Sequence, residues 1–243
     1  MTRHARHIAL AQVGAAGQQQ ISESSVLMIG VGGIGCAAAS YLASGGVGHI
    51  ILNDFDTVDE TNLGRQILFG PGDVGTLKAA TAAARLTALN PDVRVSVVAE
   101  RLDASAMAIA VADVDLVLDG SDNFATRFLV NDACVSQDRC LVSGSAIRLE
   151  GQIAVFGPNY EVSPCYRCLY EEADESLENC AGNGVLAAVP GVIGTMMAVE
   201  ALKQLAGIAS PRGQLLLYDA GSSRFNAVKI SKRTACPACQ AAS

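Results

Sequence analysis

The stretch that decides the fold, residues 26–54, reads VLMIGVGGIG (26–35), CAAASYLASGGVG (36–48) and HIILND (49–54). Four consecutive apolar residues before the glycines predict a strand that is buried on both faces. The small residues of 36–44 predict a helix packed on a sheet, and the second apolar run predicts another strand. Together these three segments predict a β-α-β unit.

The glycines of this unit indicate a nucleotide site. Gly30, Gly32 and Gly35 match the G-x-G-x-x-G spacing, in which the first lets the chain turn, the second lets backbone approach a phosphate and the third lets helix pack on strand. The N–H groups at the start of the helix favour an anion. Asp54 closes the second strand, where a carboxylate accepts hydrogen bonds from ribose hydroxyls. We predict adenine-nucleotide binding; the alternative is a glycine turn beside a structural aspartate.

Composition bounds the possible functions. The chain has 243 residues, of which 50% are apolar and 17% charged, so it forms one large or two small folded domains. A net charge of −7 and no basic run longer than Lys232-Arg233 argue against nucleic acid as a partner. Residues 1–20 lack the order of a signal peptide, and the uncharged run 180–199 contains Asn183, Pro190 and several glycines, unlike a membrane span. We therefore expect a cytoplasmic protein with no membrane partner.

The remaining apolar runs predict one mixed sheet. Further strands are expected over 94–99, 116–119, 141–143, 152–156, 215–218 and 226–230, and further helices over 3–13, 78–89, 107–111, 125–135 and 192–205. Strands that alternate with helices are parallel, and closely spaced strands are antiparallel. We predict a single α/β domain over residues 1–243 with a Rossmann-like sheet, parallel in the N-terminal half and antiparallel at its C-terminal end. The first helix is expected to cap this sheet.

Polar residues follow two of the predicted parallel strands. Asn62, Arg65 and Gln66 lie in the connection after the second strand, placed to reach a nucleotide at the carboxyl ends. The alternative for this connection is a solvated loop. Asp122 follows strand 116–119, where a carboxylate can hold magnesium beside phosphates. Asp122 or Asn123 could instead cap the next helix, and the residues leave both roles open.

The cysteines divide into three groups. Cys165 with Cys168 and Cys236 with Cys239 form two C-x-x-C pairs, a spacing typical of a closed and therefore structural tetrahedral zinc site. A thioredoxin-like redox pair is disfavoured because neither pair opens a helix after a first strand. Cys180 stands in an acidic segment, 171–184, and is a candidate nucleophile or transfer residue. The other three cysteines are expected in the core: Cys36, Cys134 and Cys140.

Taken in order, these motifs resemble the ThiF, MoeB and HesA family, bacterial relatives of the ubiquitin-activating enzymes. The resemblance extends from Arg3 to Cys239. Such enzymes use MgATP to adenylate the C-terminal glycine carboxylate of a ubiquitin-like sulfur carrier of ThiS or MoaD type that ends in Gly-Gly, releasing pyrophosphate. The motifs are Gly30, Gly32, Gly33 and Gly35, then Asp54 and Asp56, residues 62–66 (NLGRQ), Lys78, residues 120–123 (GSDN), both cysteine pairs, and Cys180 with residues 184–185.

The resemblance also implies roles for individual residues. Asp54 holds the ribose, and Asp122 binds magnesium. Arg6 matches the second arginine of an R-x-x-R motif that reaches the triphosphate of the other protomer, which implies a homodimer. Cys180 matches a cysteine that joins the carrier in some members. The residues implied for phosphate contact are Asn62, Arg65, Gln66 and Lys78, with Asp56 and Asn123 completing the nucleotide site.

The sequence departs from the family pattern in places. His4 and His7 stand where tyrosine and glutamine are usual, and Leu77 replaces a proline. Residues 143–152 look like the molybdopterin-type enzyme, whereas 207–213 and 221–223 look like the thiamine-type one, and we lean slightly to the MoeB-like reading. No rhodanese-like extension follows Cys239, so sulfur is expected from a cysteine desulfurase or another donor.

The chain divides into two functional halves on this interpretation. Residues 1–145 form the nucleotide-binding half, and 146–243 form the half with the carrier site, crossover loop and zinc site. One rival is an NAD-dependent oxidoreductase, disfavoured because no hydride-transfer site is evident and all three histidines, His4, His7 and His49, are N-terminal. The other is an inactive scaffold, which the joint presence of Arg65, Lys78 and Asp122 argues against.

Overall fold

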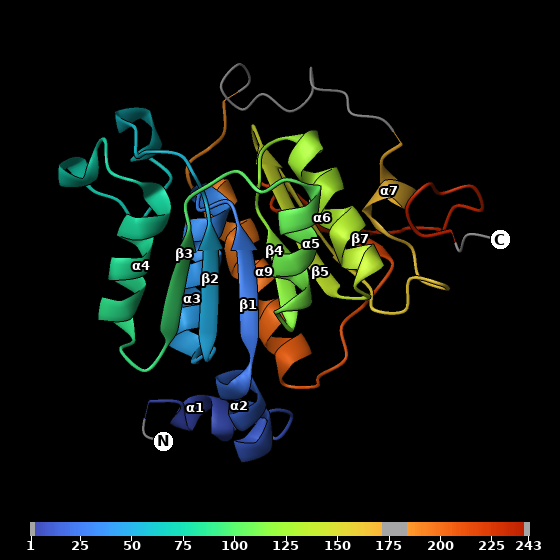
Figure 1. The fold of residues 1–243 in the computed structure, drawn as a ribbon, viewed down its shortest axis with the longest axis horizontal. Coiled ribbons are helices and arrows are strands. Elements are labelled where there is room, and N and C mark those ends of the chain that lie inside the picture. Colours follow the sequence, from blue (N-terminus) through green and yellow to red (C-terminus); the bar gives the residue numbers. More distant parts are fainter. Residues whose placement is uncertain (1–2, 172–183, 241–243) are drawn as a thin grey trace.

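A single eight-stranded sheet forms the centre of the protein in the computed structural model, which describes residues 3–171 and 184–240 (Figure 1). The strand order is β3-β2-β1-β4-β5-β6-β7-β8; the pairs from β3 to β5 are parallel and those from β5 to β8 antiparallel. The predicted mixed sheet is therefore confirmed. The strands are β1 (Ser25–Ile29), β2 (His49–Asn53), β3 (Arg94–Val98), β4 (Leu116–Asp119), β5 (Cys140–Ile147), β6 (Glu150–Phe156), β7 (Gln214–Asp219) and β8 (Arg224–Lys229).

Helices cover both faces of this sheet (Figure 1). One face carries α3 (Gly33–Gly45), α4 (Lys78–Leu89) and α9 (Ala188–Leu205), and the other carries α5 (Ala104–Ala112), α6 (Phe124–Ser136) and α7 (Tyr166–Leu169). Alternate residues of β1 point into the two cores, Met28 toward the α3 side and Leu27 toward the α6 side. This two-sided burial is the physical reason for the unbroken apolar run of β1.

The glycine segment forms the predicted β-α-β turn. Gly30 has a φ of +80°, a backbone conformation that favours glycine. A Cβ at Gly35 would collide with the carbonyl of Gly30, so only glycine lets α3 pack this closely. The predicted turn at Gly30 and the predicted close packing at Gly35 are confirmed. The helix α3 begins at Gly33, earlier than the predicted residue 36.

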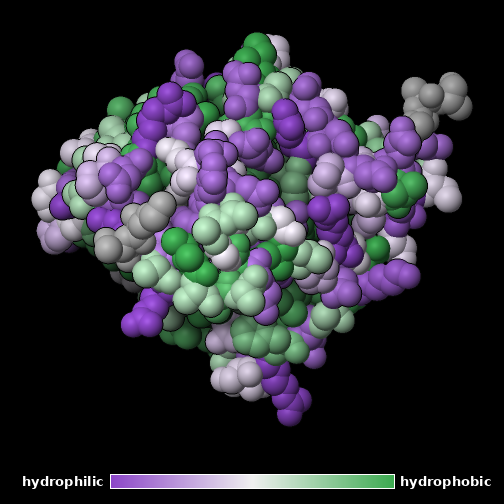
Figure 2. Space-filling view, turned by 90° about the horizontal axis from the view of Figure 1, so that it is seen from below, coloured by the Kyte–Doolittle hydropathy of each residue, from purple (hydrophilic) through white to green (hydrophobic). Residues whose placement is uncertain are grey.

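The N-terminal segment differs from the prediction of one helix over 3–13. A short α1 (Ala5–Ile8) is followed by a separate helix, α2 (Gly14–Glu23). One continuous helix is not possible because Gly14 has a φ of +59°, outside the helical range. The helix α2 was not predicted, since its glycines and glutamines mask the apolar period; its Gln18 is buried and donates to the Gly45 carbonyl at 3.0 Å. Both helices lie at the amino ends of the parallel strands (Figure 1), where apolar residues gather near the middle of the lower face (Figure 2).

The last helix also starts earlier than expected. α9 begins at Ala188 because Pro190 lies in its first turn, where a backbone N–H needs no intrahelical partner. Cys36, Cys134 and Cys140 are buried, as predicted. Two 3-10 turns, Glu60–Asn62 and Pro71–Asp73, lie between β2 and α4. In the described part of the chain, no helix is both long and apolar enough for a membrane span.

Candidate active site

The carboxyl ends of β1, β2 and β4 open into a cavity of about 500 Å³, a size in the usual range for ligand sites. Residues from the glycine segment, the connection after β2, the start of α4 and the loop after β4 meet there. Gly35 does not line the cavity, because it packs against Gly30. The lining includes most of the nucleotide-site residues named from the sequence: Gly30, Gly32, Gly33, Asp54, Asp56, Asn62, Arg65, Gln66, Lys78, Asp122 and Asn123.

Asp54 ties the glycine loop to the end of β2. Its Oδ2 accepts a hydrogen bond from the Val31 N–H at 2.7 Å, and its Oδ1 accepts one from the Asp56 N–H at 2.9 Å. Burial raises the pKa of this carboxyl, and the two N–H donors partly offset that shift. The carboxylate is therefore held rigidly at the cavity wall, and each oxygen keeps further acceptor capacity for a ligand hydroxyl.

Two cationic side chains reach the cavity beside this wall. Lys78 is the first residue of α4, is 7% exposed, and places Nζ 3.0 Å from Asp56 Oδ2. Arg65 donates from Nη1 to the Thr61 carbonyl at 2.9 Å. Two cations that line the same cavity as the glycine loop, one at the start of α4 and one in the connection after β2, suit a polyanionic ligand such as a triphosphate.

The loop after β4 shows which of two adjacent residues, Asp122 or Asn123, caps the next helix. Asn123 is the N-cap of α6, and its Oδ1 accepts a hydrogen bond from the Thr126 N–H at 2.9 Å. Asp122 is exposed, lines the cavity and takes no part in that cap. The cap therefore belongs to Asn123, whose Nδ2 also donates to Asp122 Oδ1 at 3.4 Å, and the Asp122 carboxylate lies at the cavity.

Arg127 and Asp119 also shape this loop, and the sequence analysis missed both. Arg127 is buried in the cavity wall, and its Nε and Nη2 donate to the Ser121 carbonyl at 3.2 and 2.9 Å. Asp119 Oδ1 accepts from the Ser121 N–H at 3.0 Å, and burial raises the pKa of this carboxyl. The sequence did contain a signal for Arg127, because it is a cation in the first turn of a helix that follows a buried strand. Together the two side chains fix Ser121, the residue before Asp122.

A second arm of the cavity extends over the antiparallel half of the sheet. Its floor is a row of register partners, Ser145 on β5, Gln152 on β6 and Leu217 on β7. Tyr170, which directly follows α7, lines the same arm. The cavity therefore extends from the parallel half of the sheet to the antiparallel half.

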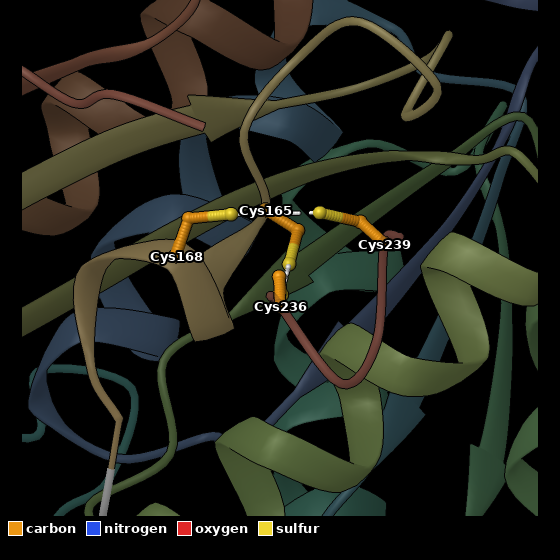
Figure 3. Close-up of side chains that lie close together, drawn as sticks. All are labelled: Cys165, Cys168, Cys236 and Cys239. Carbon is orange, nitrogen blue, oxygen red and sulfur yellow. Dashed lines mark hydrogen bonds between the residues drawn. The ribbon is translucent and has the colours of Figure 1, made fainter. Parts of the chain in front are cut away.

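The four paired cysteines converge at a separate buried position (Figure 3). Their sulfur atoms all lie within 4.8 Å of one another, with 3.6 Å between Cys165 and Cys236 and 3.4 Å between Cys168 and Cys239. A tetrahedral zinc ion with bonds of about 2.3 Å requires sulfurs about 3.8 Å apart, so the donor set fits such an ion. The predicted grouping of the two C-x-x-C pairs is confirmed.

Two of the predicted site residues lie elsewhere. Arg6 is exposed on α1, at the amino ends of the strands, and does not line the cavity of its own chain. A role at a nucleotide site therefore requires the cavity of a second copy. Cys180 lies outside the described residues.

Comparison with known proteins places these observations in one family. The model of the ThiF family matches residues 4–238. The chain is 43% identical over 237 residues to the sulfur carrier protein ThiS adenylyltransferase of Escherichia coli K12, covering 98% of this chain and 94% of that protein. It is also 43% identical over 240 residues to the molybdopterin-synthase adenylyltransferase of the same organism, covering 98% and 96%.

A solved structure shares the fold. The crystal structure of E. coli MccB with ATP superposes with a TM-score of 0.85, covering 98% of this chain and 73% of that chain at 23% sequence identity. At this level of identity the likeness concerns the fold alone. The eight-stranded sheet and its helical layers are therefore an established architecture.

Proposed function

The chain belongs to the ThiF family, and from this premise we propose that it is an ATP-dependent adenylyltransferase of a ubiquitin-like sulfur carrier protein. The observation that carries this proposal is the meeting of Arg65, Lys78 and Asp122 beside the glycine loop, in one cavity that continues over the antiparallel half of the sheet. Two relatives that share 43% identity over nearly their full length are named for this activity.

The reaction joins two anions, which explains the charges in the site. A carboxylate oxygen at the carrier's C-terminus attacks the α-phosphorus of ATP, and the bond from that phosphorus to the bridging oxygen breaks. The products are an acyl-adenylate and pyrophosphate. Fixed cations that neutralise the phosphates lower the barrier to this approach. Arg65 and Lys78 supply that charge from one side of the cavity.

We assign the nucleotide contacts by position along the cavity. The glycine loop from Gly30 to Gly35 receives the phosphates at the start of α3, and Asp54 receives the ribose hydroxyls. Asp122 holds Mg²⁺, which neutralises phosphate charge when it is bound. The phosphate contacts are Asn62, Arg65, Gln66 and Lys78, with Asp56 and Asn123 supporting the same site.

The four cysteines hold a structural Zn²⁺ in this proposal. A closed set of four thiolates has no position for a substrate, so this ion contributes to folding and not to catalysis. It fastens the C-terminal segment around Cys236 and Cys239 to the strand-to-helix connection at Cys165.

The active form is a homodimer with composite sites. Arg6 lies at the end of the molecule opposite the cavity, so it can reach a triphosphate only in a partner subunit. Leu10, in the same segment, is 52% exposed, and apolar residues gather near the middle of this lower face (Figure 2). An exposed apolar surface beside α1 supports a contact with a second copy.

Sulfur delivery follows adenylation. Cys180 is proposed to take part in the transfer of the activated carrier, and a separate cysteine desulfurase or other donor supplies the sulfur. Residues 1–145 act as the nucleotide-binding half and residues 146–243 as the carrier-binding half. Identity to the thiamine-type and the molybdopterin-type relative is equal at 43%. Residues 143–152 look like the molybdopterin type and residues 207–213 and 221–223 like the thiamine type, and the proposal leans slightly to a carrier of the molybdopterin type.

ATP–pyrophosphate exchange tests this function. The purified chain with Mg²⁺ is given, in separate reactions, a thiamine-type and a molybdopterin-type carrier ending in Gly-Gly. We expect exchange that requires a carrier and is stronger with the molybdopterin type. A carrier shortened by its last glycine is the matched control. Exchange with the thiamine-type carrier alone would assign the chain to the thiamine pathway. No exchange with either carrier would reject the proposed activity.

A further inference from the structure

The second arm of the cavity contains a polar pair that the nucleotide site does not use. Gln152 Nε2 donates to the Tyr170 hydroxyl at 2.6 Å, and that hydroxyl lies 3.0 Å from Gln152 Oε1. Both residues line the cavity and both are half-buried. The pair therefore places an amide and a hydroxyl side by side on the wall of this arm.

Packing holds Tyr170 firmly in this position. Its ring lies 5.0 Å from the ring of Tyr166 and 5.4 Å from that of Phe124. The backbone N–H of Tyr166 donates to Asn131 Oδ1, a fully buried side chain, at 2.8 Å. Because Tyr166 stands between Cys165 and Cys168, the first cysteine pair and α6 together orient Tyr170. A side chain fixed in this way is suited to binding rather than to adapting its shape.

Gln152 is held in a row on the sheet. Its register partners are Ser145 on β5 and Leu217 on β7, and all three line the cavity. Residues directly opposite one another on neighbouring strands share a face, so the Gln152 amide projects from the floor of the arm. The floor leads toward Asp122, in the loop after β4, and Arg127, on the first turn of α6, which line the same cavity.

A tail that ends in glycines offers its binding site only peptide groups. It has no side chains to fill pockets, so recognition depends on donors and acceptors that match backbone N–H and C=O groups. A glutamine amide is chemically the counterpart of a peptide group, and a tyrosine hydroxyl can donate and accept. The Gln152–Tyr170 pair is a matched set for such an extended backbone.

We propose that Gln152 and Tyr170 form the recognition element for the backbone of the carrier's C-terminal tail. This inference rests on the proposed function, because it assigns the second substrate of the same cavity. The pair exchanges part of its mutual hydrogen bonding for bonds to peptide groups of the tail and so orients the terminal carboxylate. The two residues contribute affinity for the carrier tail and take no part in nucleotide binding.

Steady-state kinetics of Tyr170→Phe and Gln152→Leu test the proposal. AMP formation is measured against carrier concentration at saturating MgATP, and against ATP at saturating carrier. Loss of one or two hydrogen bonds predicts a KM for the carrier raised about tenfold, whereas the KM for ATP stays within about twofold of the parent value. The double variant should cost less than the product of the two single effects, since the residues act as a unit.

The variants are designed to keep the fold. Tyr170→Phe retains the ring contacts and removes one oxygen, so thermal unfolding and zinc content should match the parent. Tyr218→Phe, which removes a hydroxyl from β7 outside the cavity lining, is the matched control and should change neither KM. Gln152→Glu keeps the size of the side chain but removes its N–H donors, and it should also weaken carrier binding.

The outcomes separate this inference from the function on which it rests. A parent enzyme active with a carrier, together with an unchanged carrier KM in both single variants, would overturn the role of the pair and leave the activity standing. Equal rises in the KM for ATP and for the carrier would also overturn it, since they indicate general damage to the cavity. Lack of exchange in the parent enzyme would reject the proposed function itself and this inference with it.

Discussion

The Lys78 ammonium lies 3.0 Å from Asp56 Oδ2, with the lysine side chain 9% exposed and the aspartate side chain 57% exposed. A bridge with one partner in solvent contributes about 1 kcal/mol or less to stability. We therefore expect Lys78 to contribute more to ligand binding in the cavity than to stability, with a triphosphate replacing Asp56 as its partner.

Replacing this lysine separates those two contributions. We expect Lys78→Met to lower adenylation by about 100-fold or more, because a fixed cation at the phosphates is lost. The melting temperature should change little. Pyrophosphate exchange and thermal unfolding measure the two effects. Lys203→Met is the control, since Lys203 is also ion-paired, with Glu200 on α9, and does not line the cavity; equal loss of activity in both variants would contradict the assignment.

The neighbours Asp122 and Asn123 should respond in opposite ways. Asp122→Ala is expected to abolish adenylation with an unchanged melting temperature, because its carboxylate lines the cavity and does not cap α6. Asn123→Ala removes the cap, so the free energy of unfolding should fall by about 1 kcal/mol while measurable adenylation remains. Urea unfolding and pyrophosphate exchange on both variants check this pattern. Normal turnover of Asp122→Ala would remove that residue from the mechanism.

Complementation between two inactive variants tests the composite site. If Arg6 acts on the partner subunit, a mixed dimer of Arg6→Ala and Asp122→Ala has one intact site and one doubly damaged site. Co-refolding equal amounts should then restore about a quarter of the parent activity, since half of the dimers are mixed and each has one working site. Each variant refolded alone is the control. An inactive mixture, with mixed dimers shown by differential tags, would place Arg6 outside the partner's site.

The cysteine cluster should bind about one zinc ion per chain. Lys232 Nζ lies 3.1 Å from Cys239 Sγ and 2.6 Å from the Cys239 carbonyl, so it offsets thiolate charge and anchors the last cysteine pair. We expect Lys232→Met to release zinc to a chelator about tenfold faster, because groups that support metal ligands tune affinity to about this degree. Elemental analysis and a colorimetric chelator measure the content and the rate. Lys229→Met on β8 is the control. A native protein that contains no metal would contradict the zinc assignment.

Asp119 should make stability depend on pH. Burial raises the pKa of this carboxyl above its ordinary value of 3.8, so its favourable contribution is complete below that value and is lost as pH rises through the raised pKa. The parent should therefore lose stability relative to Asp119→Asn over the pH range above 3.8, as the buried carboxyl is forced to ionise. Urea unfolding across this range, with Asp113→Asn as the surface control, measures the difference. A difference that is constant with pH would contradict the prediction.

Much of the fold was accessible from local patterns. The apolar runs around Leu27 and Leu118 predict parallel strands because burial on both faces leaves no polar alternation, and the helix 78–89 was placed at its observed bounds since Asn90 and Pro91 end it. The helix α2 was not predicted because contacts with distant parts of the chain stabilise it. Gly17 faces Ala206, and Gln18 finds its partner on the carbonyl of Gly45.

By itself, the sequence determined the chemistry that is written in short spacings: the glycine loop, Asp54 after its strand, the cations Arg65 and Lys78, and the two C-x-x-C pairs. Tertiary structure decided which of these groups meet and what each is able to do. In the folded chain Asn123 caps α6, whereas Asp122 lines the cavity. The sulfur atoms of Cys165 and Cys236 lie 3.6 Å apart, and Tyr170 lies beside Gln152. The cap is a local contact, but two adjacent residues could make it and only the backbone conformation selects one of them. The other two contacts join residues 71 and 18 positions apart in the chain, and the paired strands and packed helices set their distances.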